Sequence, residues 1–259
     1  MTSALTRNRP RLRLLGGWQL TGAVPPRGTV GENARKLVSL LALRGPMPRA
    51  RIAETLWPES DGDAAARLRT VLWRLGDGRT LLLEQDGRLS LARDVRVDVA
   101  EMRAAALALT NGAKEADTGR LRVETFSADL LPGWDDDWLQ IDRERIRQLR
   151  LHALEALSML SLRHGDYAAA LDAALAAVLA DPLRESAHRC VIETHLAEGN
   201  VADARRAFEQ CQRLLARELQ VAPSPTLVAL APALGVWPRR GPAAPPPGAR
   251  DGAPGPVVA

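Results

Sequence analysis

A pattern of residue types in the second half of this chain repeats at an interval of 34 residues. Gly165 recurs as Gly199, and four positions after the first glycine recur after the second: Tyr167, Ala170, Ala174 and Ala177 correspond to Val201, Ala204, Phe208 and Cys211. This period is typical of stacked helical hairpins. Glycine permits the sharp turn between paired helices, and alanine five positions later lets their axes approach closely. The repeat therefore predicts a helical array.

The predicted array is tetratricopeptide-like, and Asp181-Pro182 ends its first hairpin. Upstream, the apolar spacing predicts helices over 100–109 and about 137–164, with no strand signal after Val99. Aromatic residues make up only 3% of the chain, so the core must be built mainly from Leu, Ala and Val. We expect an all-α domain over residues 97–237.

The first third of the chain has a different pattern. Short strands are predicted within 11–20, helices over 34–43, 48–57 and about 63–76, and a β-hairpin over 81–92 with its turn at Asp86-Gly87. Two helices followed by a wing are typical of a winged helix-turn-helix. The expected fold class is therefore mainly α, with an N-terminal α+β winged helix-turn-helix over 11–96. Residues 1–10 and the Pro/Gly/Ala-rich tail 238–259 are expected to be flexible and disordered, respectively.

The third helix carries two distinct faces. Apolar residues fall on one face at helical spacing: Ala64 (or Ala65), Leu68, Leu72 and Leu75. Arg67, Thr70 and Arg74 fall on the other, where guanidinium groups suit phosphates and guanine edges in a major groove. Asp61 or Asp63 is expected to cap the helix N-terminus.

The charge distribution favours a polyanionic partner for the first third. Residues 1–96 hold 17 basic and 9 acidic side chains, whereas residues 97–237 hold 15 and 21. Arg outnumbers Lys 33 to 2, a bias typical of high-GC genomes that weakens the meaning of any single arginine. For the candidate DNA contacts Arg67, Arg69, Thr70 and Arg74, a solvated helix face is thus the alternative interpretation, and for the candidates Arg35 and Lys36 it is solvent-facing charge. Two further candidate DNA contacts are Arg88, whose acidic neighbours Glu84 and Asp86 would repel DNA, and Trp57, for which packing in the core is the alternative.

No pattern in the sequence supports catalysis, a cofactor or a bound metal. Cys190 and Cys211 read as small buried hydrophobic residues, and His188 and His195 lack the spacing of a zinc helix. The three carboxylates of 135–137 are better explained by helix capping and the helix dipole. No stretch has the length and apolarity of a membrane span, so we expect a cytoplasmic protein that is not an enzyme.

Several collinear stretches carry a family resemblance: Ile52–Pro58, Ala66–Leu75, Asp129–Gly133, Gly165–Tyr167, Asp181–Glu185 and Glu218–Pro225. On these, residues 11–96 resemble an OmpR-type winged helix, and residues 97–235 resemble the bacterial transcriptional activation domain of SARP-type regulators, the antibiotic regulatory proteins of high-GC bacteria. Two departures are the interruption Gly76-Asp77-Gly78 after the third helix and the loss of an acidic residue within 220–223.

The resemblance implies a transcriptional activator that binds direct repeats in double-stranded promoter DNA and recruits RNA polymerase through sigma factor. It also implies that the protein is associated with the nucleoid and controls a secondary-metabolite gene cluster. A homodimer is one arrangement in which such a protein could bind DNA. Two alternatives stay open: a helical-repeat adaptor between proteins, and a ligand-responsive regulator or repressor. The sequence does not identify the operator, the target genes or an effector.

Overall fold

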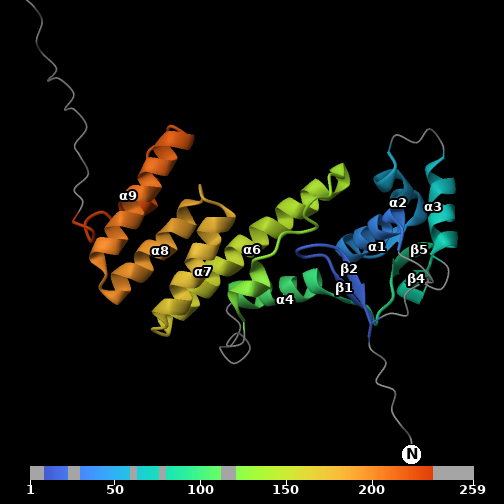
Figure 1. Ribbon diagram of the computed structural model, residues 1–259, viewed down its shortest axis with the longest axis horizontal. Coiled ribbons are helices and arrows are strands. Elements are labelled where there is room, and N and C mark those ends of the chain that lie inside the picture. Colours follow the sequence, from blue (N-terminus) through green and yellow to red (C-terminus); the bar gives the residue numbers. More distant parts are fainter. Residues whose placement is uncertain (1–8, 23–29, 59–62, 76–79, 112–120, 236–259) are drawn as a thin grey trace, which may run out of the picture.

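The computed structural model describes residues 9–22, 30–58, 63–75, 80–111 and 121–235. It is elongated, with a small mixed lobe at one end and a row of helices extending from it (Figure 1). We call the part formed by β1–β6 and α1–α3 the N-terminal lobe, and the part from α4 to α10 the helical lobe. Among the described residues, no helix is both long enough and apolar enough to cross a bilayer.

The N-terminal lobe combines three helices with two small sheets. Its elements are β1 (Arg11–Arg13), β2 (Gln19–Thr21), α1 (Glu32–Arg44), β3 (Met47–Pro48), α2 (Arg49–Leu56), α3 (Ala64–Arg74), β4 (Leu82–Gln85), β5 (Arg88–Leu91) and β6 (Arg96–Val97). One sheet has the order β2-β1-β6 and the other β3-β5-β4. The β4–β5 hairpin is the predicted wing, and both residues of its turn, Asp86 and Gly87, have positive φ (52° and 70°).

The helical lobe stacks its long helices in chain order (Figure 1). Its elements are α4 (Asp98–Thr110), the 3₁₀ turn η2 (Val123–Phe126), α6 (Asp137–Arg163), α7 (Tyr167–Ala180), α8 (Glu185–Glu198), α9 (Val201–Glu218) and α10 (Pro225–Val228). The repeated glycines lie in the turns of the α6–α7 and α8–α9 hairpins, at φ 74° and 87°. Ala170 and Ala204, equivalent in the repeat, are fully buried.

The fold class is therefore as predicted: mainly helical, with a winged helix-turn-helix before a tetratricopeptide-like array. One hydrophobic core lies inside the N-terminal lobe, where Leu37 of α1 packs with Leu68 and Leu72 of α3. A second core joins the two lobes, since Leu12 of β1 belongs to the same cluster as Phe126 of η2. The two lobes are thus held together by shared buried apolar surface.

The sequence did not predict the short strands β3 and β6. β6 pairs in parallel with β1, and its successor Asp98 accepts hydrogen bonds from the backbone N–H groups of Leu14 and Leu15 at 2.9–3.0 Å. A two-residue strand has no periodicity, so only the tertiary pairing defines it.

The predicted cap of α3 is not formed by Asp63. This residue stands at the N-cap position, but its backbone is already helical (φ −98°, ψ −3°) and its side chain accepts no bond from the helix. Several predictions lie outside the described residues: Asp61, the loop at 24–28, the glycines of 76–78, most of the 110–120 loop, residues 1–8 and the tail 238–259.

Candidate nucleic-acid interface

The third helix separates a buried face from a charged face, as its sequence predicts. Leu68, Val71, Leu72 and Leu75 are each less than 10% exposed and pack into the N-terminal lobe. The remaining side includes five exposed side chains: Arg67, Arg69, Thr70, Trp73 and Arg74. The helix lies at the outer end of the molecule, away from the helical lobe (Figure 1).

The three guanidinium groups of this face have no partner among the residues that the structure describes. Arg67, Arg69 and Arg74 form no hydrogen bond or ion pair with any residue that the structure describes. Thr70 Oγ1 donates to the carbonyl of Ala66 at 3.0 Å, one turn back in the same helix. The face therefore offers three cations, and its hydroxyl keeps the capacity to accept a hydrogen bond.

The exposed Arg51 lies on α2, the helix that precedes α3, and Trp57 directly follows the last residue of α2. Trp57 is half-buried and packs against the core of the N-terminal lobe, and its backbone N–H donates to Ala53 at 2.9 Å. Arg51 was not singled out from the sequence, although the position belongs to the first helix of the helix-turn-helix, which crosses the DNA backbone in such motifs. The Trp57 side chain thus has a packing role whether or not it also reaches a phosphate.

The wing carries Arg88, the exposed first residue of β5. Its Nη2 donates to the carbonyl of Pro46 at 2.9 Å, so this guanidinium is partly used inside the protein. Glu84, on the opposite strand, is paired with Arg49 at 2.7 Å. The pair offsets a carboxylate that would otherwise repel DNA.

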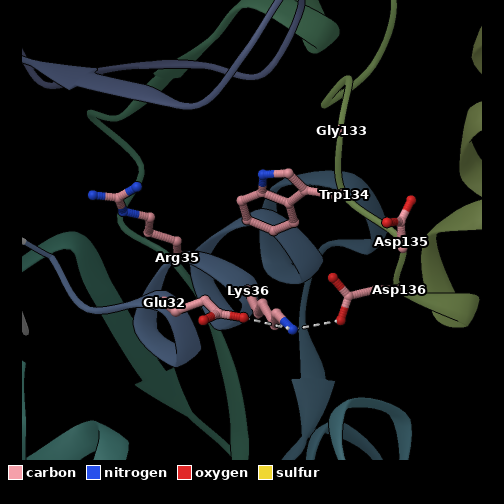
Figure 2. Close-up of a pocket in the computed structure, with 7 residues that line it drawn as sticks. All are labelled: Glu32, Arg35, Lys36, Gly133, Trp134, Asp135 and Asp136. Atoms are coloured by element: carbon pink, nitrogen blue, oxygen red, sulfur yellow. Dashed lines mark ion pairs between the residues drawn. The ribbon is translucent and has the colours of Figure 1, made fainter.

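Arg35 and Lys36 lie at the junction of the two lobes. They border a hollow of about 460 Å³ between α1 and the segment 133–136 (Figure 2). Arg35 Nε donates to Val30 O at 2.9 Å, and its guanidinium lies 5.1 Å from the centre of the Trp18 ring.

Lys36 bridges the lobes. Its Nζ lies 2.8 Å from Asp136 Oδ1 and 3.0 Å from Glu32 Oε1. Burial alone would lower the pKa of Lys36, but the hydrogen bonds to Asp136 and Glu32 outweigh it and hold that pKa above its usual value. Asp136 stands at the N-cap of α6 but makes no cap bond, so the capping role expected for this acidic run is replaced by the ion pair.

A second polar contact fixes the same junction. Arg44, at the end of α1, bonds through Nε to Asp142 Oδ2 at 2.9 Å and through Nη2 to the carbonyl of Trp138 at 2.6 Å. Asp142 is only 2% exposed. Together with the shared core, these bonds set the orientation of α1 relative to the long helix α6.

The cysteine and histidine positions have structural surroundings. Cys190 and Cys211 are free and buried, and burial raises the pKa of each thiol to about 11. His188 is 5% exposed, with its Nε2 2.8 Å from the carbonyl of Pro182. Within the described ranges, no group of three or more His, Cys, Asp or Glu side chains could hold a metal ion.

Trp73 is the residue of this face that sequence reasoning missed. It is 79% exposed, an unusual position for a large apolar side chain. The signal was present in the spacing, because residue 73 follows Thr70 by three positions and cannot join the apolar face of Leu68 and Leu72.

Comparison with known proteins gives one family and several relatives. The family described as bacterial transcriptional activator domain matches residues 78–234. The regulatory protein AfsR of Streptomyces coelicolor is 29% identical over 214 residues, covering 77% of this chain and 21% of AfsR. AfsR of Streptomyces griseus is 27% identical over 217 residues, covering 75% and 21%. The chain thus spans about a fifth of the length of these relatives.

A solved structure shares the fold. Mycobacterium tuberculosis EmbR, in complex with a low-affinity phosphopeptide, superimposes with a TM-score of 0.65 over 87% of this chain and 65% of the EmbR chain. The sequence identity is 21%, so this likeness concerns the fold.

Proposed function

The chain belongs to the bacterial transcriptional activator domain family and is a transcriptional regulator of the SARP type; from that premise, we propose that it activates transcription by binding promoter DNA through α3. The proposal depends on one observation above all. Arg67, Arg69 and Arg74 share an exposed helix face and have no partner among the described residues. In an interface with DNA, each would find a phosphate oxygen or a guanine edge.

Of the other candidate residues, two are assigned to the edge of this interface and two to a structural role at the junction of the lobes. Arg88 on the wing is placed at the edge, where a phosphate oxygen would replace the Pro46 carbonyl as its partner. Trp57 is placed there too, with its indole N–H as the donor. Arg35 and Lys36 are assigned instead to the junction between the lobes, because both are already bonded there.

The helical lobe would act on the partners of the bound regulator. SARP-type activators are expected to bind direct repeats and to recruit RNA polymerase through sigma factor, and we extend both roles to this chain. Two protomers on adjacent repeats would form a homodimer on DNA, and such a protein would be found on the nucleoid. The AfsR resemblance favours a secondary-metabolite cluster as the target.

Selection of duplexes from a random pool, followed by footprinting, tests the DNA-binding part. We expect enriched fragments that contain two equal half-sites in direct repeat. Arg67→Ala and Arg74→Ala should each weaken the footprint without changing the melting temperature. Footprints equal to that of the unmodified protein for both variants would contradict the mechanism. Transcription in vitro from the selected site then decides between activation and repression.

An adaptor function has one observation in its favour. Leu175 and Leu179 of α7 are 50% and 84% exposed, one turn apart, on a helix whose only charged residue is Asp172. A helical array that grips another protein would use such a surface. Recovery of a stoichiometric protein partner, together with no enriched DNA in the selection, would favour this function over the first.

A further inference from the structure

We propose that Trp73 is a specificity-determining residue that reads thymine, by packing its indole against the C5 methyl group on the floor of the major groove. The inference rests on the proposed DNA-binding function and names a base that the site should require. It also changes the expected readout. Arginine–guanine pairs would no longer be the sole source of sequence preference, since an apolar contact with thymine is a distinct mode of direct readout.

The exposure of Trp73 is the first observation. Its side chain is 79% exposed, whereas Trp57, in the preceding turn region of the same lobe, packs against the core. A single exposed apolar side chain is common on protein surfaces and would need no explanation alone. What distinguishes Trp73 is its position on the face that carries the three arginines of α3, none of which is bonded to a residue within the described ranges.

The order of side chains around α3 is the second observation. With about 100° between successive residues, Ala66, Thr70 and Trp73 lie farthest from the buried face, which is formed by Leu68, Val71, Leu72 and Leu75. The three arginines flank this uncharged strip, Arg67 and Arg74 on one side and Arg69 on the other. The face thus has a neutral centre and cationic edges.

This arrangement matches the cross-section of a major groove. An α-helix with its side chains is roughly 10–12 Å across, and the groove is about 12 Å wide. A helix that enters it therefore presents its centre to the base edges and its flanks to the phosphates of the two strands. The hydroxyl proton of Thr70 is already donated to Ala66, which reduces the polar character of the centre further. Trp73 is the largest apolar group there.

The charges around Trp73 favour DNA over a protein partner. Leu179 of α7, which is 84% exposed, lies on a helix without a cation, whose single charged residue is Asp172. Trp73, in contrast, directly precedes Arg74 and lies one turn after Arg69. A surface that combines an exposed indole with three exposed guanidinium groups suits a polyanion with apolar groups between its charges.

Deoxyuridine substitution tests the inference at the level of one methyl group. In a selected half-site, each thymine is replaced in turn by deoxyuridine, which lacks only the C5 methyl, and affinity is measured by fluorescence anisotropy. We expect one position at which the loss weakens binding of the unmodified protein by about fourfold. For Trp73→Ala the same replacement should have no further effect, and for Trp73→Phe it should have an intermediate one.

Leu179→Ala is the matched control, since it removes an apolar side chain of similar exposure far from α3. It should keep the full deoxyuridine effect, and thermal unfolding should show Trp73→Ala as stable as the unmodified protein. If deoxyuridine weakened binding equally in Trp73→Ala and Leu179→Ala, the role of Trp73 would be overturned while DNA binding stayed intact. The same conclusion would follow if deoxyuridine had no effect on binding of the unmodified protein at any position. A Trp73→Ala variant that keeps its single-site affinity but loses contact with RNA polymerase or a second protomer would also overturn that role. Failure of the selection to enrich any sequence would overturn the proposed function itself.

Discussion

The arginines of two helices, α3 and α6, differ in how their side chains are used. On α3 we compare all three, Arg67, Arg69 and Arg74, and on α6 we compare three of its five, Arg143, Arg147 and Arg150. Those of α3 are exposed and bonded to no described residue. Those of α6 are bonded to carbonyl and carboxylate groups of the protein. In a chain with 33 arginines, residue type alone therefore says little about function.

The most deeply buried of the α6 group is Arg150, 4% exposed. Its Nε and Nη2 donate to the carbonyls of Phe126 and Ser127, each at 2.7 Å, and its Nη1 pairs with Asp129. One guanidinium thus holds the end of η2 against the long helix. The comparison shows that an arginine stabilises this fold where its donors are satisfied internally, and becomes a candidate for recognition where they are not.

Arg150→Ala should have the largest effect on folding. It leaves the buried Phe126 carbonyl and the partly buried Ser127 carbonyl without this donor and removes the ion pair with Asp129, so we expect the free energy of unfolding to fall by about 3 kcal/mol. Urea denaturation measures this. The control is Arg145→Ala, an exposed arginine of the same helix, which should change the value by less than about 0.5 kcal/mol. Equal losses for both would show that the internal bonds of Arg150 do not matter.

The salt dependence of DNA affinity tests the role of the exposed arginines of α3. If the α3 arginines meet phosphates, DNA affinity should fall steeply as salt rises, and Arg69→Ala should reduce the slope of log K against log salt by about one. Anisotropy titrations at several salt concentrations give this slope. The same slope for Arg69→Ala and the unmodified protein would remove Arg69 from the interface.

A variant of Lys36 tests whether a cation that is already bonded inside the protein contributes to DNA binding. Lys36→Met removes the ion pairs to Asp136 and Glu32 and is expected to lower the free energy of unfolding by about 1 kcal/mol. DNA affinity should stay within about twofold, because the charge lies at the junction rather than on α3. Normal stability with a large loss of affinity would reverse this assignment.

The smallest expected effect concerns the acidic partner of another bonded arginine. Burial alone would raise the pKa of Glu155, but hydrogen bonds from Arg184 and Ser186 outweigh it and hold that pKa below its usual value. Its contribution to stability is therefore present above the ordinary carboxylate pKa of about 4.3 and is lost as the pH falls through the lowered folded value. The stability gap between the unmodified protein and Glu155→Gln should narrow from pH 7 to pH 3 in denaturant titrations. A gap that widens on acidification would contradict the direction of the shift.

The elements that the sequence predicted well are those with a strong local pattern. The faces of α3, the Asp86-Gly87 turn and the glycine turns of the repeat each follow from spacing or from positive φ within a few residues. The exposure of Arg67, Thr70 and Arg74 also followed, since the apolar spacing assigns them to the outer face.

The features that the sequence could not predict depend on contacts between distant segments. Asp98 bonds to β1 across more than 80 positions, and Lys36 meets Asp136 across the junction of the lobes. No local pattern encodes such partners, so Lys36 looked as free as Arg67. Trp73 is a different case, because its spacing placed it outside the apolar face but its residue type suggested burial.

The most direct test of the account compares two double variants of equal charge on a selected operator. Arg67→Ala with Arg74→Ala removes two arginines from α3, and Arg145→Ala with Arg163→Ala removes two exposed arginines from α6. With about tenfold or more expected for each specific contact, the α3 pair should lower affinity by about a hundredfold and the α6 pair by less than about threefold. Similar losses for the two pairs would show that net charge, and not the exposed face of α3, determines DNA binding.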